Sequence, residues 1–208
     1  MLEKGNIIRQ SNTTKYTGTT NKIDMFDPQF AQFVESQGIN GADQVVFLGD
    51  GATWIWNMQK RQCPNAICII DFFHATEHLN GTIGELRFHS AEKREEFRAE
   101  CYRLLELGEI GQLASIINGK ANTANAEKIS DCLSYFTENA EKMRYGLFRA
   151  AGLFIGSGVI EAACKTIVGK RMKNTGMHWS KKNAEGMIAL RCAINSGEFD
   201  SDKVDAVA

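Results

Sequence analysis

The stretch that decides the fold runs from residue 44 to residue 71 and begins Gln44-Val-Val-Phe-Leu48-Gly-Asp50-Gly51. Its apolar run predicts a short buried strand whose acidic residue emerges at the carboxyl end. Residues 54–61 then predict a helix that ends before Pro64, and Ala66-Ile-Cys-Ile-Ile70-Asp71 repeats the strand pattern. Strand, helix, strand and a further helix predict an α/β fold with parallel neighbouring strands.

On the amino-terminal side of this stretch, residues 5–19 combine Ile7-Ile8 with a threonine-rich tract, which favours short strands or a hairpin. Apolar residues then recur at helical spacing from Phe26 onward. They predict a helix over about 27–37 that ends at Gly38. Trp54 and Trp56 are expected to pack in or near the core.

On the carboxyl-terminal side, residues 72–150 lack proline and repeat apolar positions at spacings of three and four. They predict a helical block with breaks near Gly108 and over 119–123. Two last helices are expected, one capped by Ser157 and ending near Met172, the other capped by Ser180 and ending near Asn195. The acidic tail after residue 197 is expected to fray.

Bulk properties favour a cytoplasmic protein with one substantial core. The chain has 208 residues and a formal charge of −1. Its six cysteines form no C-x-x-C motif and follow no secretory signal, which predicts reduced thiols. No apolar run approaches the ~18 residues of a membrane span, so we expect no membrane partner.

The charge is unevenly distributed, because residues 162–184 contain six cations and no acid. The rest of the chain therefore carries −7. An aromatic residue that could stack on a base lies among the cations, so the segment favours contact with nucleic acid, although a solvated helix face would also explain it. The predicted DNA-binding residues are Lys165, Lys170, Arg171, Lys173, Trp179, Lys181 and Lys182.

Two carboxylates are candidates for metal chemistry. Asp50 follows a predicted strand, where α/β proteins place ligand-binding groups, and Glu161 lies in the first turn of a predicted helix. Together they could hold Mg²⁺, which prefers oxygen ligands. The simpler interpretations are a turn aspartate that binds local amides and a helix carboxylate favoured by the helix dipole.

A zinc site is the rival hypothesis. His74-Ala-Thr-Glu77-His78 matches the H-x-x-E-H pattern of inverted zinc metallopeptidases, with two histidine ligands and a glutamate that activates water. A third ligand is not evident from the sequence. The alternative is that His74 packs beneath the sheet and His78 is half exposed.

Four blocks of the chain resemble, in order and spacing, the carboxyl-terminal part of bacterial insertion-sequence transposases of the Kra type. These blocks, which fall within residues 20–197, are Leu48-Gly-Asp50-Gly-Ala-Thr-Trp-Ile-Trp56, Ile70-Asp-Phe-Phe-His-Ala-Thr-Glu-His-Leu79, Ile155-Gly-Ser-Gly-Val-Ile-Glu161-Ala-Ala-Cys-Lys165 and Arg171-Met-Lys-Asn-Thr-Gly-Met-His-Trp179-Ser. The resemblance implies a DDE transposase with a ribonuclease H-like catalytic domain.

By that resemblance, Asp50 and Glu161 match the second and third acids of the family's Asp, Asp, Glu set. Both would bind metal, with Asp71 and His74 in supporting roles. The implied reaction is phosphoryl transfer with two Mg²⁺ or Mn²⁺ ions, which nicks transposon ends and then joins a strand to target DNA. Lys165 would hold a DNA phosphate one helical turn beyond Glu161.

The chain departs from the family pattern at the first acid. Asp24, Asp27 and Asp43 fall at or after the first predicted helix, and residues 1–23 offer only Glu3. We therefore expect an incomplete two-metal site, an amino-terminally truncated sheet with exposed edges, marginal stability, and a fragment that binds DNA weakly without cutting it. A non-catalytic DNA-binding remnant is a further alternative.

The expected organisation is a partial ribonuclease H-like sheet with its helices over residues 1–80 and an all-helical insertion over 81–150. Residues 151–197 would form the helices that carry Glu161 and the basic patch, and 198–208 the tail. The expected partners are transposon-end and target DNA, with a second copy of the chain as a further candidate, in the bacterial cytoplasm and on the nucleoid when bound to DNA.

Overall fold

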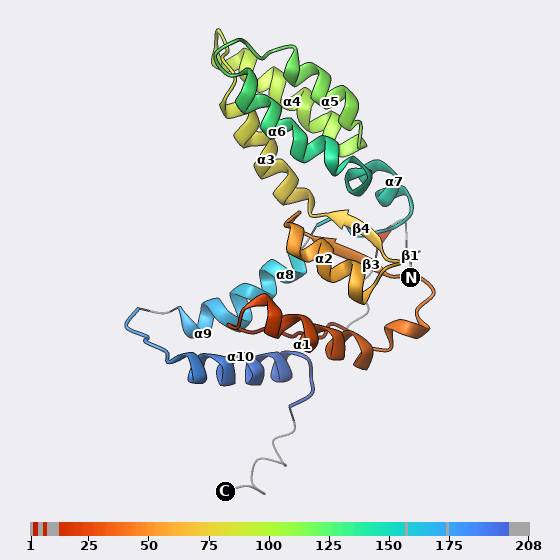
Figure 1. The fold of residues 1–208 in the computed structure, drawn as a ribbon, viewed down its shortest axis with the longest axis vertical. Helices are drawn as coiled ribbons and strands as arrows, with labels where there is room; N and C mark the ends of the chain where they lie inside the picture. Colours follow the sequence, from red (N-terminus) through yellow and green to blue (C-terminus); the bar gives the residue numbers. More distant parts are fainter. Residues whose placement is uncertain (1, 4–5, 8–12, 157, 174, 200–208) are drawn as a thin grey trace, which may run out of the picture. The chain divides into compact units, whose positions relative to one another are not determined.

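The computed structural model describes residues 2–3, 6–7, 13–156, 158–173 and 175–199. The chain divides into two compact units, and the structure defines the fold of each unit separately. Figure 1 labels their helices and strands. Unit 1 comprises residues 1–42 and 158–208, and unit 2 comprises residues 43–157. The organisation predicted from the sequence, with segments 1–80, 81–150, 151–197 and 198–208, uses different boundaries, and it stays a prediction.

Unit 2 begins with a parallel strand pair. Strand β3 (Val46–Gly49) is followed by helix α2 (Thr53–Gln62) and strand β4 (Ile67–Ile70). The register pairs Val46 with Ile67 and Gly49 with Ile70. This arrangement confirms the predicted strand, helix and parallel strand, and the mixed α/β class, because adjacent parallel strands need a crossover of this kind.

Two predictions about burial in this region are wrong. The strand expected to be buried, β3, is partly exposed, since Val46 at its start is 37% exposed and the next two residues are only partly buried, while Ile69 and Ile70 of β4 are fully buried. Trp54 is 45% exposed, whereas Trp56 is buried as expected. The apolar pattern of β3 and β4 is similar in sequence, so only the packing of the following helices distinguishes them.

The helical block confirms the prediction for residues 72–150. It comprises α3 (Phe72–Gly84), α4 (Ala91–Leu107), α5 (Ile110–Asn118), α6 (Ala126–Glu138), the 3₁₀ turn η2 (Ala140–Met143) and α7 (Tyr145–Ala150). The predicted breaks occur at Gly108, which has a φ of 79°, and over 119–125. A side chain at Gly108 would lie 2.9 Å from the Arg144 backbone, so the turn requires glycine.

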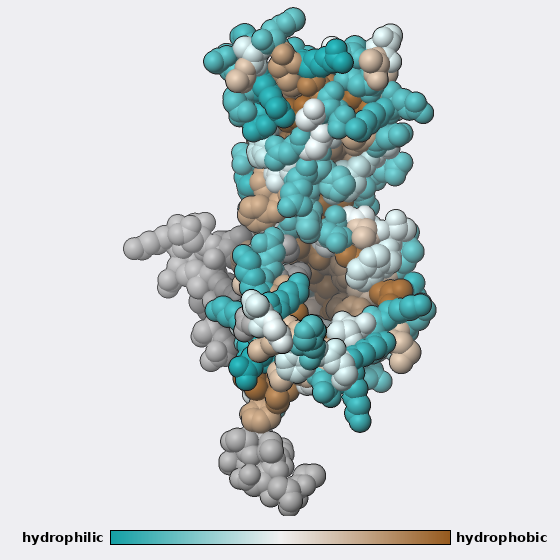
Figure 2. All heavy atoms as spheres, turned by 90° about the vertical axis from the view of Figure 1, so that its left-hand side faces the viewer, coloured by the Kyte–Doolittle hydropathy of each residue, from teal (hydrophilic) through white to brown (hydrophobic). Residues whose placement is uncertain are grey.

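The core of unit 2 is continuous from the strands into this block. Fully buried side chains from both include Ile69, Ile70, Leu79, Leu105, Leu113, Ile117, Phe136 and Tyr145. The face shown in Figure 2 is mostly hydrophilic, with apolar side chains scattered among the polar ones. On α4 the exposed face carries ion pairs one turn apart, such as Arg103 with Glu100 at 2.7 Å.

Unit 1 contains α1 (Ile23–Ser36), the 3₁₀ turn η1 (Ile39–Gly41), and two pairs of residues that form a short antiparallel ladder, β1 (Leu2–Glu3) and β2 (Asn6–Ile7). Gly38, with a φ of 74°, follows α1 where its end was predicted. Residues 13–20 form no strand, so the prediction of strands across the threonine-rich tract is wrong there.

The carboxyl-terminal helices of unit 1 are α8 (Gly158–Ala163), the π-helical segment η3 (Cys164–Gly169), α9 (Lys170–Met172) and α10 (Lys181–Asn195). The first three form one run, so the helix expected to Met172 is present but widens in its middle. Ser180 caps α10 by accepting from the Asn183 amide at 3.2 Å, as predicted. The predicted cap at residue 157 and the frayed tail from residue 200 lie outside the described residues.

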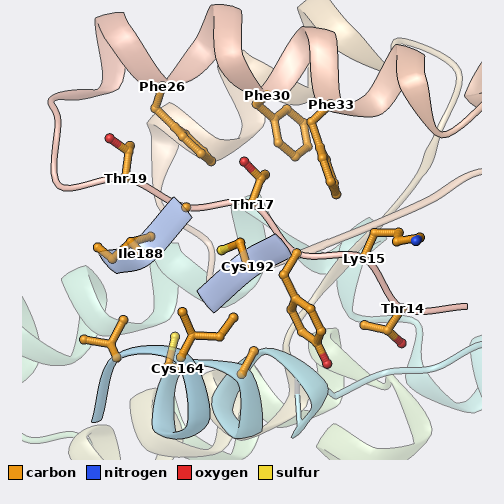
Figure 3. A pocket seen from close by; sticks show the side chains of 15 residues that line it. Thr14, Lys15, Thr17, Thr19, Phe26, Phe30, Phe33, Cys164, Ile188 and Cys192 are labelled. Atoms are coloured by element: carbon orange, nitrogen blue, oxygen red, sulfur yellow. The ribbon is translucent and has the colours of Figure 1, made fainter. Parts of the chain in front are cut away.

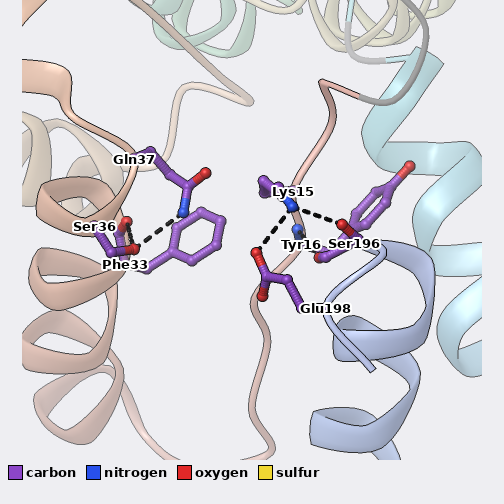
Figure 4. A network of polar contacts seen from close by, with 7 residues as sticks. All are labelled: Lys15, Tyr16, Phe33, Ser36, Gln37, Ser196 and Glu198. Atoms are coloured by element: carbon purple, nitrogen blue, oxygen red, sulfur yellow. Dashed lines mark hydrogen bonds and ion pairs between the residues drawn. The ribbon is translucent and has the colours of Figure 1, made fainter. Parts of the chain in front are cut away.

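Residues 15–20 form hydrogen bonds and an ion pair with residues at or near both ends of α10. At its carboxyl end, the Lys15 Nζ donates to the Ser196 carbonyl at 2.7 Å and pairs with Glu198 at 3.0 Å (Figure 4). The Tyr16 amide donates to the Ser196 hydroxyl at 2.9 Å. Near its amino end, Glu185 accepts from Thr19 and Thr20. Polar contacts thus connect two sequence-distant segments, and Tyr16 also packs against the buried cluster that includes Ile188 and Cys192 of α10.

Two general expectations can be compared with the structure. All six cysteines are free thiols, as predicted. Among the described residues, no helix combines the length and the apolar character needed to cross a membrane.

Candidate functional site

The carboxyl end of β3 presents Asp50 on a tight turn. The Asp50 side chain is exposed, and its Oδ1 accepts from the Ala52 amide at 2.9 Å. Gly51 has a φ of 101°, which side-chain-bearing residues rarely adopt. The structure therefore keeps a carboxylate at the solvent-facing end of the strand, where the sequence placed it.

Asp71 occupies the corresponding position after β4 but has a different environment. It is 1% exposed, and its Oδ1 accepts from the His74 amide at 2.9 Å, so it is the N-cap of α3. Its own amide donates to the Gly49 carbonyl at 2.7 Å. This bond ties the start of α3 to the residue before Asp50.

The histidine motif on α3 faces solvent at its first turn. The His74 Nδ1 lies 3.2 Å from the Glu77 Oε2, and the His74 side chain is 43% exposed. The interpretation that His74 packs beneath the sheet is therefore wrong, because the first turn of α3 projects beyond the strand ends. His78 is also exposed, and its ring stacks on Tyr135 with centroids 3.8 Å apart.

The His78 pKa is lowered, mainly by partial burial and also by the neighbouring His74, against the opposing effects of Glu77 and Asp50. Glu77 pairs with His74 in this geometry. Within the part of the chain that the structure describes, no group of three or more His, Cys, Asp or Glu side chains could hold a metal ion. The zinc hypothesis thus has no third ligand among the described residues and stays untested.

Tyr135 is a member of this site that the sequence did not reveal. It comes from α6, yet a Cβ at Gly51 would lie 3.0 Å from its ring. The Tyr135 pKa is raised to about 12, first by burial and then by the charges of Asp50 and Asp71. In sequence it is one aromatic residue of an amphipathic helix, so no local pattern connects it with the Asp50 turn.

Tyr145 lies deeper behind Asp71. Its ring packs edge-on against Phe72 at 5.1 Å, and burial raises the pKa of its hydroxyl far above its ordinary value. The hydroxyls of Tyr135 and Tyr145 are both buried without a hydrogen-bond partner among the described residues. Both tyrosines therefore remain neutral near physiological pH.

The chain returns to this end of the sheet after the helical block. The Ile155 carbonyl accepts from the Phe72 amide at 2.9 Å. A Cβ at Gly156 would lie 3.1 Å from the Phe73 ring and 4.0 Å from the Asp71 Oδ2. Only glycine leaves the backbone this close to Asp71 without displacing the aromatic ring.

Glu161 and the basic residues lie in unit 1. Glu161 is exposed on α8, and the six cations between residues 165 and 182 are exposed on the following helices and loops. Trp179 is only partly exposed, and its Nε1 is buried without a hydrogen-bond partner in the described part of the chain. Asp50 lies in unit 2 and Glu161 in unit 1, and the structure defines each unit separately. The predicted pairing of Asp50 with Glu161 in one metal site therefore stays a prediction.

The widened segment η3 directly follows Glu161 and Ala163. Its wide turn is seen in the bond from the Lys170 amide to the Lys165 carbonyl, five residues back. Arg191 of α10 donates to the Thr166 carbonyl within it at 2.8 Å. Widened turns of this kind often occur at functional sites, and here one separates the acid from most of the basic residues.

Unit 1 also contains an apolar pocket of about 440 Å³. The rings of Phe26, Phe30 and Phe33 point into it from α1 toward Ile188 and Cys192 of α10 (Figure 3). Segment 14–19 and η3 complete its lining. The aromatic face of α1 is thus only partly covered, since α1 contributes no buried residue.

No protein-family model matches the chain, and no curated protein or solved structure matches it significantly. The resemblance to the transposases rests on the four sequence blocks.

Proposed function

We propose that this chain provides metal-binding and DNA-binding parts of a DDE-type transposase with a ribonuclease H-like catalytic domain. The observation that carries the proposal is the exposed Asp50 carboxylate at the end of a parallel strand. The neighbouring strand ends at Asp71, and the chain returns beside Asp71 at Gly156, five residues before Glu161. In open α/β sheets this end of the strands is where ligands bind.

The covalent path supports a shared site for the two acids. Gly156 is fixed beside Asp71, and Glu161 follows five residues later. A fully extended segment of that length spans at most about 18 Å, and helical residues within it shorten the reach. Whatever the arrangement of the two units, Glu161 stays within this radius of Gly156.

The donor chemistry fits a hard divalent cation. Asp50 is exposed and has one oxygen engaged by the Ala52 amide, and Glu161 is an exposed carboxylate. Mg²⁺ is usually held by one or two carboxylates together with substrate phosphate. A bound Mg²⁺ or Mn²⁺ pair would supply charge stabilisation for an in-line displacement at phosphorus.

In this proposal Asp50 and Glu161 act as metal ligands and do not transfer protons. The exposed cations bind DNA phosphates, with Lys165 nearest in sequence to Glu161, and their sites include α9 and the start of α10. Asp71 keeps the start of α3 in place and holds the strand ends together through its amide. Trp179 offers a partly exposed ring for stacking.

Metal binding is tested with Mn²⁺ and the full chain, by isothermal titration and by paramagnetic broadening of the Gly51 and Ala52 amide signals. Asp50→Asn and Glu161→Gln should each weaken binding, and Asp131→Asn, which removes a similar charge from an exposed site on α6, should not. Equal Mn²⁺ affinity in wild type and Asp50→Asn would refute the proposed metal site.

DNA binding is tested by measuring affinity for duplex DNA over a range of salt concentrations. Replacing Lys165, Lys173 and Lys182 with alanine should reduce the salt slope by up to about one for each phosphate that a lysine no longer neutralises. The control replaces Lys60, Lys93 and Lys128, which are exposed elsewhere, and should leave the slope close to wild type. DNA binding without any Mn²⁺ binding would instead support a non-catalytic binding module.

A further inference from the structure

The helical block reaches the Asp50 turn through a single aromatic ring. Tyr135 follows Asp50 by more than eighty residues, yet its Cε2 and hydroxyl would lie 3.0 and 3.1 Å from a Cβ at position 51. The same ring also contacts the histidine motif of α3, because it stacks on the His78 ring with an angle of 18° between the ring planes. Tyr135 therefore joins two segments that each carry a predicted site residue.

The turn beneath this ring has little freedom to change. Gly51 adopts a φ of 101°, and the Ala52 amide binds the Asp50 carboxylate. The aromatic ring fills the space that a side chain at position 51 would occupy. Removal of the ring would leave room for the turn to relax and for the Asp50 carboxylate to leave the Ala52 amide.

The ring, rather than the hydroxyl, performs this task. The hydroxyl is buried and has no hydrogen-bond partner among the described residues. Loss of a buried group without a partner costs little, because no bond is broken and no partner is left unsatisfied. Phenylalanine keeps the ring and therefore serves as the conservative replacement.

We propose that Tyr135 is a positioning residue that holds the Asp50 turn in its metal-binding geometry from the helical block. The proposal rests on the metal-binding role of Asp50 proposed above. It assigns to the helical block a direct part in building the acidic site, through contact with Gly51 and His78. Tyr135 itself acts only through these neighbours.

The first test measures Mn²⁺ affinity of the full chain. Tyr135→Leu should weaken binding about 10–100-fold, the range found when groups that support metal ligands are removed. Tyr135→Phe should bind like wild type. Tyr102→Leu is the matched control, since Tyr102 is a partly buried tyrosine of α4 whose hydroxyl accepts from Asn80 at 2.7 Å, away from the turn.

The second test needs no metal. Hydrogen exchange of the Ala52 amide should accelerate in Tyr135→Leu and stay unchanged in Tyr135→Phe. Gly51→Ala should lower the unfolding midpoint less in the Tyr135→Leu background than in wild type, because the clash with the ring is then absent. The backbone strain of alanine at position 51 is present in both backgrounds. The difference between the two changes in unfolding midpoint therefore measures the contact with the Tyr135 ring alone.

The outcomes separate the two proposals. If Asp50→Asn abolishes Mn²⁺ binding while Tyr135→Leu matches wild type in affinity and in Ala52 exchange, the positioning role is refuted and the metal site stands. If wild type binds no Mn²⁺, the metal-binding role fails, and with it the assignment of Tyr135 to a metal site. Faster Ala52 exchange in Tyr135→Leu would then still establish that the ring holds the turn.

Discussion

The two units hold the predicted site residues on very different supports. In unit 2, the Asp50 turn rests on a core that runs from β4 into the helical block and contains several fully buried large side chains. In unit 1, the buried cluster consists of Ile167, Ile188 and Cys192, and α1 contributes no buried residue. Polar contacts of residues 15–20 with α10 supplement this small core.

The difference indicates how each region presents its chemistry. Apolar burial fixes the position of the Asp50 turn, since close packing tolerates little displacement. The basic helices are held by a smaller apolar cluster, a serine cap and the surface ion pair of Lys15 with Glu198, which each contribute less. We therefore expect unit 2 to unfold at higher denaturant concentration than unit 1.

The largest expected effect is on unit 2. Phe136→Ala should reduce its free energy of unfolding by about 3–5 kcal/mol, because the side chain is fully buried in the core. Hydrogen exchange of peptides from residues 43–157 would measure the loss. An equal loss of protection in unit 1 would show that the units unfold together, and the comparison would then fail.

A smaller effect is expected in the core of unit 1. Ile188→Ala should cost about 2 kcal/mol, at the lower end of the usual range, because Ile188 already borders a pocket and is packed against neighbours on fewer sides. Hydrogen exchange of peptides from unit 1 measures this loss of stability. Leu190→Ala on the exposed face of α10 is the control and should change stability by less than about 0.5 kcal/mol. A loss as large as that of Phe136→Ala would mean that unit 1 is packed as tightly as unit 2.

Helix caps allow a comparison of like with like. Asp71→Ala removes a fully buried cap of α3 and should cost about 2 kcal/mol, whereas Ser180→Ala removes an exposed cap of α10 and should cost about 1 kcal/mol or less. Denaturant titrations of both variants provide the measurement. The reverse order would show that burial does not set the strength of these caps.

The smallest expected effect is on pH dependence. The lowered His78 pKa means that the unfolded chain takes up a proton first as pH falls through 6.5, so unit 2 loses stability between 6.5 and the folded-state pKa. His78→Gln should remove this loss, and His89→Gln on the surface should not. Unit-resolved exchange at several pH values would detect it.

Unit 1 should lose stability at a lower pH than unit 2. Hydrogen bonds from Thr20, and then from Thr19, lower the Glu185 pKa below 4.5, so their stabilisation is present above pH 4.5 and is lost as pH falls through the lowered pKa. Glu185→Gln should remove this dependence. Loss of unit 1 protection already near pH 6 in wild type would contradict the assignment.

Much of the local structure follows from the sequence. The parallel strand pair, the helical block, the helix end at Gly38 and the Ser180 cap all reflect periodicity or capping chemistry within a few residues. The exposed position of Asp50 and of the six cations also follows, because charged side chains are rarely buried.

Other features depended on contacts between distant segments. The partial exposure of β3, the exposure of Trp54 and the solvent-facing position of His74 depend on which surfaces the later helices cover. Tyr135 is the clearest case, since the apolar periodicity of α6 predicts only that one face of this helix is buried. Its contact with Gly51 arises because the helical block folds back over the strand ends.

The sequence by itself determined where most helices and the parallel strand pair form and which charged groups stand at their ends, because propensity, periodicity and capping act over a few neighbouring residues. Only the tertiary structure decided that a tyrosine of the helical block covers the Asp50 turn, that Asp71 is buried as a helix cap, and that unit 1 has a small core beside an apolar pocket. Packing brings together groups that local patterns cannot relate, and this is the physical reason for the division.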